Sequence, residues 1–528
     1  MNNVNAKPNP KRWIILAACI LASMVPAIGL SMIAFIAPAI QRTFQMSNSS
    51  IGLLASIGLL IISAFILGGG TLGDIYGRKR LLLIGLVGSI FASLISMAAV
   101  SYSFLLAAQI LAGASGALVS PLSLAIILVS FESNERPKAL GILIGVSSLM
   151  IGLSILAIQW LNQSYGWRST FFIITLIALL AFFSILKIAP ESKSPSQKRV
   201  DWMGIMLCAA GLIGIVFGIN AANGPNGFLT RSVIVPVLLG LFIICVFFWW
   251  ESRTEHAAMP FGLFQNRVFS ISMIINVLMG LVISGITFQI SNYFQVLLNL
   301  PPMRAALLMA PLPLSLFLFS ILGGLFIGRL GNRNVLFLGT IISMLGVLVM
   351  ALIVGRDNVL WIFLASEVLL GFGLGVANTA QANVTLSIPP RELAGSSSAV
   401  NNAGQTLGNS LGIALLNSML MIFGISAYHR ILGDAGMSQS QIYNATILLK
   451  KILVDDVGYV ASKYSLPVSK LENLFVGYVQ AYETALAEVL IFAAAVLLIC
   501  AVLTWIFIPN VALSDTQLPN EVLEENNQ

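Results

Sequence analysis

One acidic side chain stands inside a long apolar run of the sequence. Glu367 lies about eight residues into the run that begins near 359, with apolar residues on both sides. At roughly 1.5 Å per residue this is some 12 Å along a helix. An ionised side chain deep in a bilayer costs roughly 2.5–3.5 kcal/mol, so Glu367 must face a cavity, pair with a cation or stay protonated. No Lys or Arg lies at a comparable depth, which makes Glu367 a candidate for proton coupling or for binding a cationic substrate.

Amide side chains in other apolar runs could line a substrate path. Gln109, Gln159, Asn378 and Gln381 join Glu367 as coupling or substrate candidates. For each amide, a hydrogen bond between helices is the alternative role. The wider set of amides in apolar runs adds Asn276, Gln289, Asn292, Gln295, Asn401, Asn402 and Gln405.

Metal and disulfide chemistry find no support in the sequence. The two histidines, His256 and His429, are far apart, and all four cysteines lie inside apolar runs. We therefore expect no metal site, no cofactor and no disulfide. No phosphate-binding glycine loop is present, which argues against a pump driven by ATP.

A short glycine-rich and basic stretch, 70–80, separates two long apolar runs. Its notable residues are Gly70, Gly73, Asp74, Gly77 and Arg78. We interpret the stretch as the loop of a membrane hairpin, in which two of the glycines allow an immediate turn. A second copy, 324–333, follows 254 residues later, with Gly328 at the place of the acid. A repeated loop between repeated spans indicates a transporter built from two similar halves.

The composition excludes a soluble protein. Of the 528 residues, 58% are hydrophobic and only 9% are charged, which is too few charges for a water-facing surface. Apolar runs of about 20 residues recur, and each can cross a bilayer as a helix. Fourteen spans are predicted, near 13–38, 51–72, 81–100, 103–126, 139–160, 169–188, 203–222, 232–250, 268–296, 304–327, 334–354, 359–384, 396–424 and 484–508.

Basic residues indicate the orientation of these spans. Seventeen lie in loops on the side of the N-terminus, against five in the short loops of the other side. Because cytoplasmic loops carry the excess of Lys and Arg, both termini are predicted to be cytoplasmic. The net charge of +7 is thus a topological signal, and we expect no nucleic-acid partner.

The predicted fold class is an all-α polytopic membrane protein with two pseudo-symmetric six-helix bundles and two additional central helices. The expected parts are a cytoplasmic tail 1–12, a first bundle 13–190, two linker helices within 191–267, a second bundle 268–508 and a cytoplasmic tail 509–528. An outer loop, 425–482, is expected before the last span. Apolar residues at 447–453 predict short amphipathic helices in that loop.

The pattern G-x-x-x-D-x-x-G-R-K in 70–80 resembles the loop between helices 2 and 3 of the major facilitator superfamily. Nearly the whole chain resembles the fourteen-helix drug:proton antiporters of that superfamily. The segments that carry this resemblance are 249–251 with 259–267, Tyr293-Phe294-Gln295 with 310–313, and 394–399 with 404–412. The resemblance implies that Asp74 acts as a latch against the helix that begins at 395–398.

The resemblance also implies a function. It favours a secondary transporter, not an enzyme, that exports lipophilic or amphipathic small molecules, some of them cationic, by proton-coupled alternating access. It would lie in the bacterial inner membrane as a monomer, with the small-molecule substrate, the proton and the lipid bilayer as partners.

Three features of the resemblance are altered in this chain. Gly29 stands where the family often carries an Asp, Gln109 replaces an Arg, and the segment 154–159 lacks the usual glycine–proline signature. The alternative is therefore uptake or facilitated exchange of a metabolite on the same fold. A receptor or lipid-modifying enzyme is a third possibility, but it would need acids or histidines clustered at a membrane face.

Overall fold

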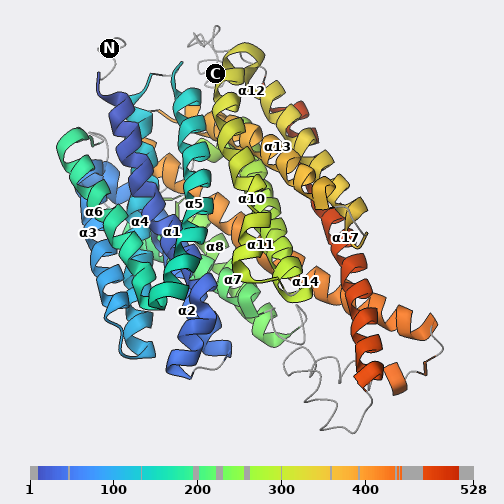
Figure 1. Ribbon diagram of the computed structural model, residues 1–528. Coiled ribbons are helices and arrows are strands. Elements are labelled where there is room, and N and C mark those ends of the chain that lie inside the picture. The colour runs from blue at the N-terminus through green and yellow to red at the C-terminus, as the bar shows by residue number, and fades with distance from the viewer. Residues whose placement is uncertain are drawn as a thin grey trace.

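The computed structural model is helical throughout the residues that it describes. These are residues 10–45, 48–132, 134–193, 201–221, 230–251, 253–254, 262–298, 300–356, 360–390, 393–434, 437–438, 440–442 and 468–509. The predicted amphipathic segment 447–453 and nearly all of both predicted tails lie outside them. The start of α1 and the end of α17 lie at the same end of the molecule (Figure 1), which we call the terminal end.

The first half of the chain forms six long helices. They are α1 (Arg12–Phe44), α2 (Asn48–Tyr76), α3 (Arg78–Met97), α4 (Tyr102–Ser130), α5 (Arg136–Tyr165) and α6 (Phe171–Ile188), with the short helix η1 (Trp167–Thr170) before α6. Local signals fix several ends. The hydroxyl of Ser101 accepts a hydrogen bond from the N–H of Phe104 and caps α4. Gly166 ends α5 with a φ of 81°, a conformation that suits glycine.

The rest of the described chain is also helical. They are α7 (Trp202–Ala221), α8 (Arg231–Glu251), α9 (Gly262–Gln265), α10 (Arg267–Asn292), η3 (Tyr293–Leu297), α11 (Pro302–Leu308), α12 (Pro311–Ile353), α13 (Leu360–Ser387), α14 (Ala394–Asp434) and α17 (Val468–Phe507). One large cluster of buried apolar side chains draws on α1 to α6. Another draws on α10 to α14 and α17.

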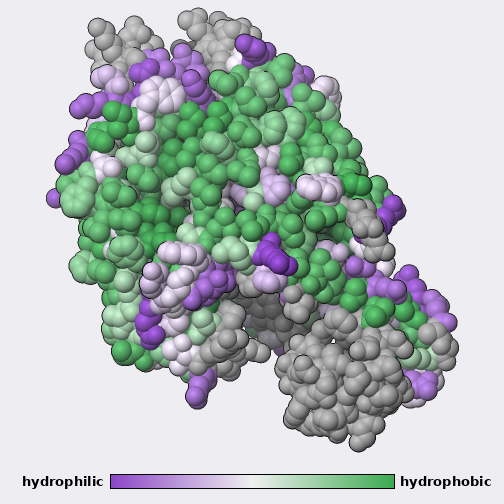
Figure 2. Space-filling view, viewed as in Figure 1, coloured by the Kyte–Doolittle hydropathy of each residue, from purple (hydrophilic) through white to green (hydrophobic). Residues whose placement is uncertain are grey.

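Twelve helices in the described part of the chain are long and apolar enough to cross a membrane. One of them, α12, has 43 residues and bends at Gly331, whose φ is 78° and ψ 160°. The apolar helix α7 is 20 residues long. Hydrophobic side chains cover the middle of the surface, and hydrophilic ones gather at the terminal end (Figure 2). This pattern is that of a multi-pass membrane protein.

The predicted loop 70–80 is mostly helix, which corrects the sequence interpretation. Residues up to Tyr76 belong to α2, and the chain turns at Gly77 alone, where φ is 112°. Gly73 does not turn; it lets α2 approach α4, because a Cβ atom there would lie 2.0 Å from Leu122. In the second copy the turn falls on Gly331, the counterpart of Gly77.

The predicted outer loop 425–482 is also partly helical. Helix α14 continues to Asp434, and α17 begins at Val468. At 41 residues, α14 is roughly 60 Å long, about twice the hydrocarbon thickness of a bilayer. The two extensions lie at the end opposite the termini (Figure 1), where Tyr428, Leu432 and Leu474 bury one another. This small cluster explains why the helices run on.

Candidate functional site

The carboxylate of Asp74, at the end of α2, meets the first residues of α14. The backbone N–H of Gly395 donates to Oδ1 at 3.0 Å, and the N–H of Ser396 donates to Oδ2 at 2.9 Å. The hydroxyl of Ser396 adds a third hydrogen bond, to Oδ2 at 3.0 Å. These N–H groups have no partner within their own helix, so the acid supplies the cap that α14 lacks.

Asp74 is also paired within its own half. Arg78 donates from Nε to Oδ1 at 2.8 Å, and its Nη2 lies 2.7 Å from the same oxygen. Asp74 is fully buried and the exposed fraction of Arg78 is 3%. A buried charge is tolerated when it is paired and hydrogen-bonded. The carboxylate of Asp74 is paired with Arg78 and accepts hydrogen bonds from the start of α14. Breaking the contact would leave a buried arginine without its anion.

Equivalent glycines bring each half against a helix start in the other half. A Cβ atom on Gly70 would lie 2.5 Å from the carbonyl oxygen of Gly395, and one on Gly324 would lie 2.4 Å from that of Pro137. The repeat seen in the sequence is therefore a repeat of contacts. Position 328, however, is a glycine, so α5 receives no carboxylate from it. A Cβ atom at Gly328 would meet open space.

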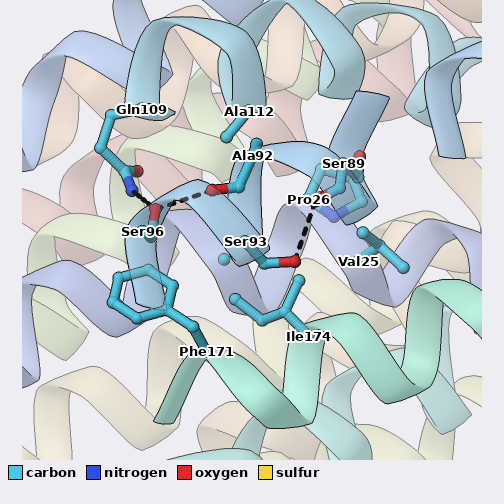
Figure 3. Close-up of a pocket in the computed structure, with 11 residues that line it drawn as sticks. Val25, Pro26, Ser89, Ala92, Ser93, Ser96, Gln109, Ala112, Phe171 and Ile174 are labelled. Atoms are coloured by element: carbon cyan, nitrogen blue, oxygen red, sulfur yellow. Dashed lines mark hydrogen bonds between the residues drawn. The ribbon is translucent and has the colours of Figure 1, made fainter. Parts of the chain in front are cut away.

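A small cavity of mixed polar and apolar lining lies inside the first half, between α1, α3, α4 and α6 (Figure 3). Its volume of about 30 Å³ is room for one or two water molecules. Gly29 and Gln109 both line it, together with three serines of α3. Gln109 donates from Nε2 to the hydroxyl of Ser96 at 3.5 Å. The two positions at which the chain departs from the family pattern thus share one cavity, and its described lining is uncharged.

A network of neutral polar groups joins α10, α13 and α14. Gln381 donates to the carbonyl oxygen of Ser272 at 3.2 Å and to the hydroxyl of Thr385 at 2.8 Å. Asn276 donates to the carbonyl oxygen of Asn401 at 2.7 Å. Three of the amides in the wider predicted set therefore hold helices together in this structure. Ser272 and Thr385 were missed, because hydroxyl residues are common in membrane helices and carry no special spacing.

Glu367 lies in α13 and is fully buried. Neither of its carboxyl oxygens has a hydrogen-bond partner in the described structure. Among the described residues, Glu367 therefore has neither an ion pair nor a hydrogen bond to a neighbouring helix, and it does not line the cavity of Figure 3. Burying an unpaired ionised carboxylate costs far more free energy than burying the neutral acid. The buried environment of Glu367 therefore favours its protonated form.

The remaining candidates do not converge with Glu367. Gln159 is buried in α5, and Asn378 is half-buried in α13. An acid that sequence reasoning missed, Glu191, accepts hydrogen bonds from the N–H groups of Lys79 and Arg80 at 3.1 and 3.2 Å. It caps α3 and so fixes the helix that follows Gly77. The signal was an acid directly after the sixth span.

Comparison with known proteins decides the family. The sequence model of the Major Facilitator Superfamily matches residues 19–413. The chain belongs to the major facilitator superfamily. It is therefore a membrane transporter and not an enzyme. The puromycin resistance protein pur8 of Streptomyces alboniger is 26% identical over 506 residues, which cover 95% of this chain and 92% of the relative.

Other similar proteins agree with this family. The multidrug efflux pump LfrA of Mycolicibacterium smegmatis is 26% identical, over 93% of this chain and 95% of the pump. Among solved structures, the proton:xylose symporter XylE has a TM-score of 0.62 at 14% identity, covering 94% of this chain and 96% of the symporter. At that identity the likeness shows the superfamily fold and nothing of the substrate.

Proposed function

We propose that this transporter is a secondary exporter of lipophilic or amphipathic small molecules, including cations. It works by alternating access and is coupled to protons. The contact between Asp74 and the start of α14 carries the proposal. It joins the two halves through three hydrogen bonds to one carboxylate, and such a contact can hold one of two conformations.

The proposal includes the topology of the chain. α12 counts as two spans that meet at Gly331, and α7 counts as one, which gives fourteen. The spans form a first bundle in 13–190, two linker helices in 191–267 and a second bundle in 268–508. The terminal end faces the cytoplasm of a bacterial cell with both termini, and the protein is a monomer in the inner membrane. The excess of basic residues in the loops of that end supports this orientation.

The proposed substrate class is supported by the names of the relatives and by the polar groups buried between α10, α13 and α14. Relatives that match nearly the whole chain are named for puromycin resistance and for multidrug efflux. The polar groups of the hydrogen-bond network that joins α10, α13 and α14 are neutral amides and hydroxyls. Neutral, partly apolar surroundings suit molecules that carry few charges and a large apolar surface.

The coupling group in this proposal is Glu367. It is a fully buried acid with no partner in the described structure, so a change of conformation that admits water would let it release a proton. Gln109, Gln159, Asn378 and Gln381 remain candidates for contacts with the substrate. Gln381 is the least suited of them, because its amide already binds Ser272 and Thr385.

A second function is favoured by one observation. The cavity that contains Gly29 and Gln109 has an uncharged described lining, which would suit uptake or facilitated exchange of a neutral metabolite.

Ethidium, a fluorescent amphipathic cation, separates the two functions in cells that lack their own efflux pumps. Export lowers cellular ethidium in cells that make the transporter, and a protonophore restores it. Unchanged ethidium with and without the transporter would contradict export of this class.

A further inference from the structure

Two buried side chains in the second half stand out by their missing partners. Both side-chain oxygens of Glu367 lack a hydrogen bond, and so do both side-chain polar atoms of Gln289. Their exposed fractions are 0% and 1%. In the described part of the chain no other side chain has two such atoms. Buried polar groups are nearly always paired, so two unpaired ones call for an explanation.

Residue spacing along α10 and α13 places the two side chains at about the same depth. Near the terminal end, the hydroxyls of Ser272 on α10 and Thr385 on α13 are 2.5 Å apart. Gln289 lies 17 residues along α10 from that contact and Glu367 lies 18 residues back along α13. At 1.5 Å per residue these are roughly 26 and 27 Å. Eighteen residues are also about five full turns, so Glu367 lies on the face of α13 that meets α10. Seventeen residues are about 4.7 turns, so Gln289 lies roughly 100° around α10 from Ser272.

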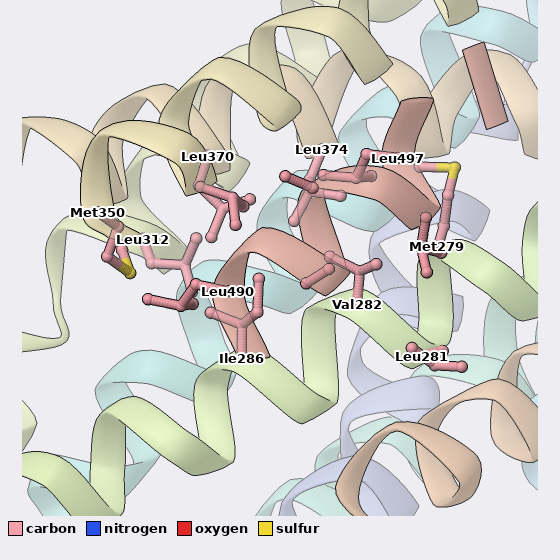
Figure 4. Packing of buried hydrophobic residues seen from close by; sticks show 14 of the residues in the cluster. Met279, Leu281, Val282, Ile286, Leu312, Met350, Leu370, Leu374, Leu490 and Leu497 are labelled. Atoms are coloured by element: carbon pink, nitrogen blue, oxygen red, sulfur yellow. The ribbon is translucent and has the colours of Figure 1, made fainter. Parts of the chain in front are cut away.

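Apolar side chains surround this level of the bundle. Ile286 of α10, Leu370 of α13 and Leu490 of α17 approach one another in one buried cluster (Figure 4). Gln289 and Glu367 each lie three residues from Ile286 and Leu370, toward the end opposite the termini. The rings of Phe294 and Phe363, 5.3 Å apart between centroids, pack η3 against α13 on the far side of the two polar residues. Apolar side chains therefore pack on both sides of Gln289 and Glu367 along the helix axes.

We propose that Glu367 and Gln289 form one proton-binding site between α10, α13 and α17. This inference rests on the proposed function and names its coupling site. An amide offers one acceptor and two donors. When α10 and α13 shift and water enters, the carboxyl group of Glu367 gives its proton to that water, and the Gln289 amide donates to the carboxylate that remains. Gln289 is thus a positioning residue that stabilises the charged state.

Other titratable groups on the surrounding helices lie mostly toward their ends. Glu483 of α17 is the acid nearest this level, and it accepts a hydrogen bond from the hydroxyl of Tyr293 at 3.4 Å, one turn beyond Gln289. Glu488 of α17 is exposed. The other described groups on α10, α12, α13, α14 and α17 are Arg267, Arg329, Arg333, Tyr428, His429, Arg430, Asp434, Tyr478, Tyr482 and the buried thiol of Cys500.

Four variants in liposomes test whether the two residues act as one site. They are Glu367→Gln, Gln289→Leu, the double variant and the control Asn276→Leu, with ethidium as the probe. We expect both single variants to lose at least tenfold in ethidium transport driven by a pH gradient, and to keep ethidium exchange at equal pH within twofold. Because the pair is one site, the double variant should lose no more than Glu367→Gln. Full driven transport by Gln289→Leu, or losses that multiply in the double variant, would overturn the proposal.

Thermal stability separates a functional role from a structural one. Gln289→Leu replaces an unpaired amide with an apolar group of similar size, so the melting temperature should stay the same or rise. Asn276→Leu removes an amide that is bonded to Asn401, so its melting temperature should fall. A fall of equal size in Gln289→Leu would show that Gln289 is structural and overturn its assigned role.

A chemical label tests the site without transport. Dicyclohexylcarbodiimide, a lipophilic reagent, reacts with protonated carboxyl groups in apolar places, and mass spectrometry of peptides locates the product. We expect Glu367 to be labelled, and the labelling to vanish in Glu367→Gln but not in the control Glu488→Gln. No label on Glu367 would contradict the site. Labelling without any ethidium exchange would instead contradict the proposed function and leave the site standing.

Discussion

The backbone N–H of Gly395 donates a 3.0 Å hydrogen bond to Oδ1 of Asp74 across 321 residues of sequence. An acid at the end of one helix thereby caps a helix of the other half. Because the same oxygen also accepts from Arg78 at 2.8 Å, the contact within the first half and the contact between halves are one unit. In the proposed cycle, opening the terminal end requires the hydrogen bonds from Gly395 and Ser396 to break, while the pair of Asp74 and Arg78 stays within the first half.

Loss of the charge on Asp74 should favour the conformation that is open at the terminal end. Asp74→Asn weakens hydrogen bonds to a charged group, which are each worth about 1.5–3 kcal/mol. We expect a shift of tenfold or more in the balance of conformations. The measurement is labelling of a cysteine at buried Ser398 by an impermeant maleimide in inverted vesicles, after replacement of the four natural cysteines.

Arg80→Gln is the matched control for Asp74→Asn. Arg80 belongs to the same stretch and is exposed, so its loss should leave the labelling of position 398 unchanged. Equal labelling in Asp74→Asn and the unaltered protein would refute the latch. Equal increases in both variants would instead indicate a general effect of charge at this end.

A second latch should be possible at Gly328. A Cβ atom there meets open space, and α5 begins with no side-chain cap. Gly328→Asp should stabilise the closed terminal end by about 0.3–1 kcal/mol, because a carboxylate near a helix start is favourable. The same maleimide measurement should show slower labelling than in the unaltered protein, and Gly328→Asn, of equal size, should not.

The gain at Gly328 should depend on Pro137. Pro137 occupies the place that Gly395 has in the other half, and proline has no N–H to donate. Adding Pro137→Ala to Gly328→Asp supplies that donor, so the double variant should close more firmly than Gly328→Asp. If the two changes together do no more than Gly328→Asp alone, the two contacts are not equivalent.

The cavity in the first half should accept a charge pair more readily than a single charge. Gly29→Asp fits sterically, because its Cβ atom would lie 3.5 Å from Ile174. Alone, Gly29→Asp or Gln109→Arg buries an unpaired charge and should lower the melting temperature. The double variant should recover part of that loss, with a coupling of about 0.5–3 kcal/mol. Strictly additive losses would show that positions 29 and 109 do not face each other.

Close packing of α14 against α10 should depend on Gly412. A Cβ atom there would lie 2.1 Å from the carbonyl oxygen of Leu281, so Gly412→Ala must push the helices apart. We expect a destabilisation of about 1–3 kcal/mol. Gly433→Ala, on the same helix with open space around it, is the control. Similar melting temperatures for both variants would show that the close approach is not needed.

The hydrogen bonds from Asp74 to the start of α14 lie where the motif led us to expect a contact, and the action of this contact as a latch stays a prediction. The spacing of the two copies located the equivalent glycines, and the resemblance pointed from Asp74 to the start of α14. The ends of helices were less predictable. Gly73 is needed for packing on Leu122, not for turning, and that reason exists only once α4 lies beside α2.

The shared cavity and the unpaired acid could not be predicted from sequence. Gly29 and Gln109 are 80 residues apart, and nothing in either run says that they line one cavity. The sequence showed that Glu367 is buried in an apolar span, but left a cation, a hydrogen bond and a neutral acid open. The missing partners of Glu367 follow from how α10, α13 and α17 pack.

Proton-driven movement of ethidium by purified protein in liposomes tests the central claim most directly. With an acidic lumen, the unaltered protein should concentrate ethidium inside at least tenfold above protein-free liposomes, and a protonophore should abolish the gain. Glu367→Gln should not concentrate ethidium, yet should still exchange it at equal pH. Equal, full accumulation by Glu367→Gln, or ethidium movement by the unaltered protein that ignores the pH gradient, would contradict proton-coupled export through Glu367.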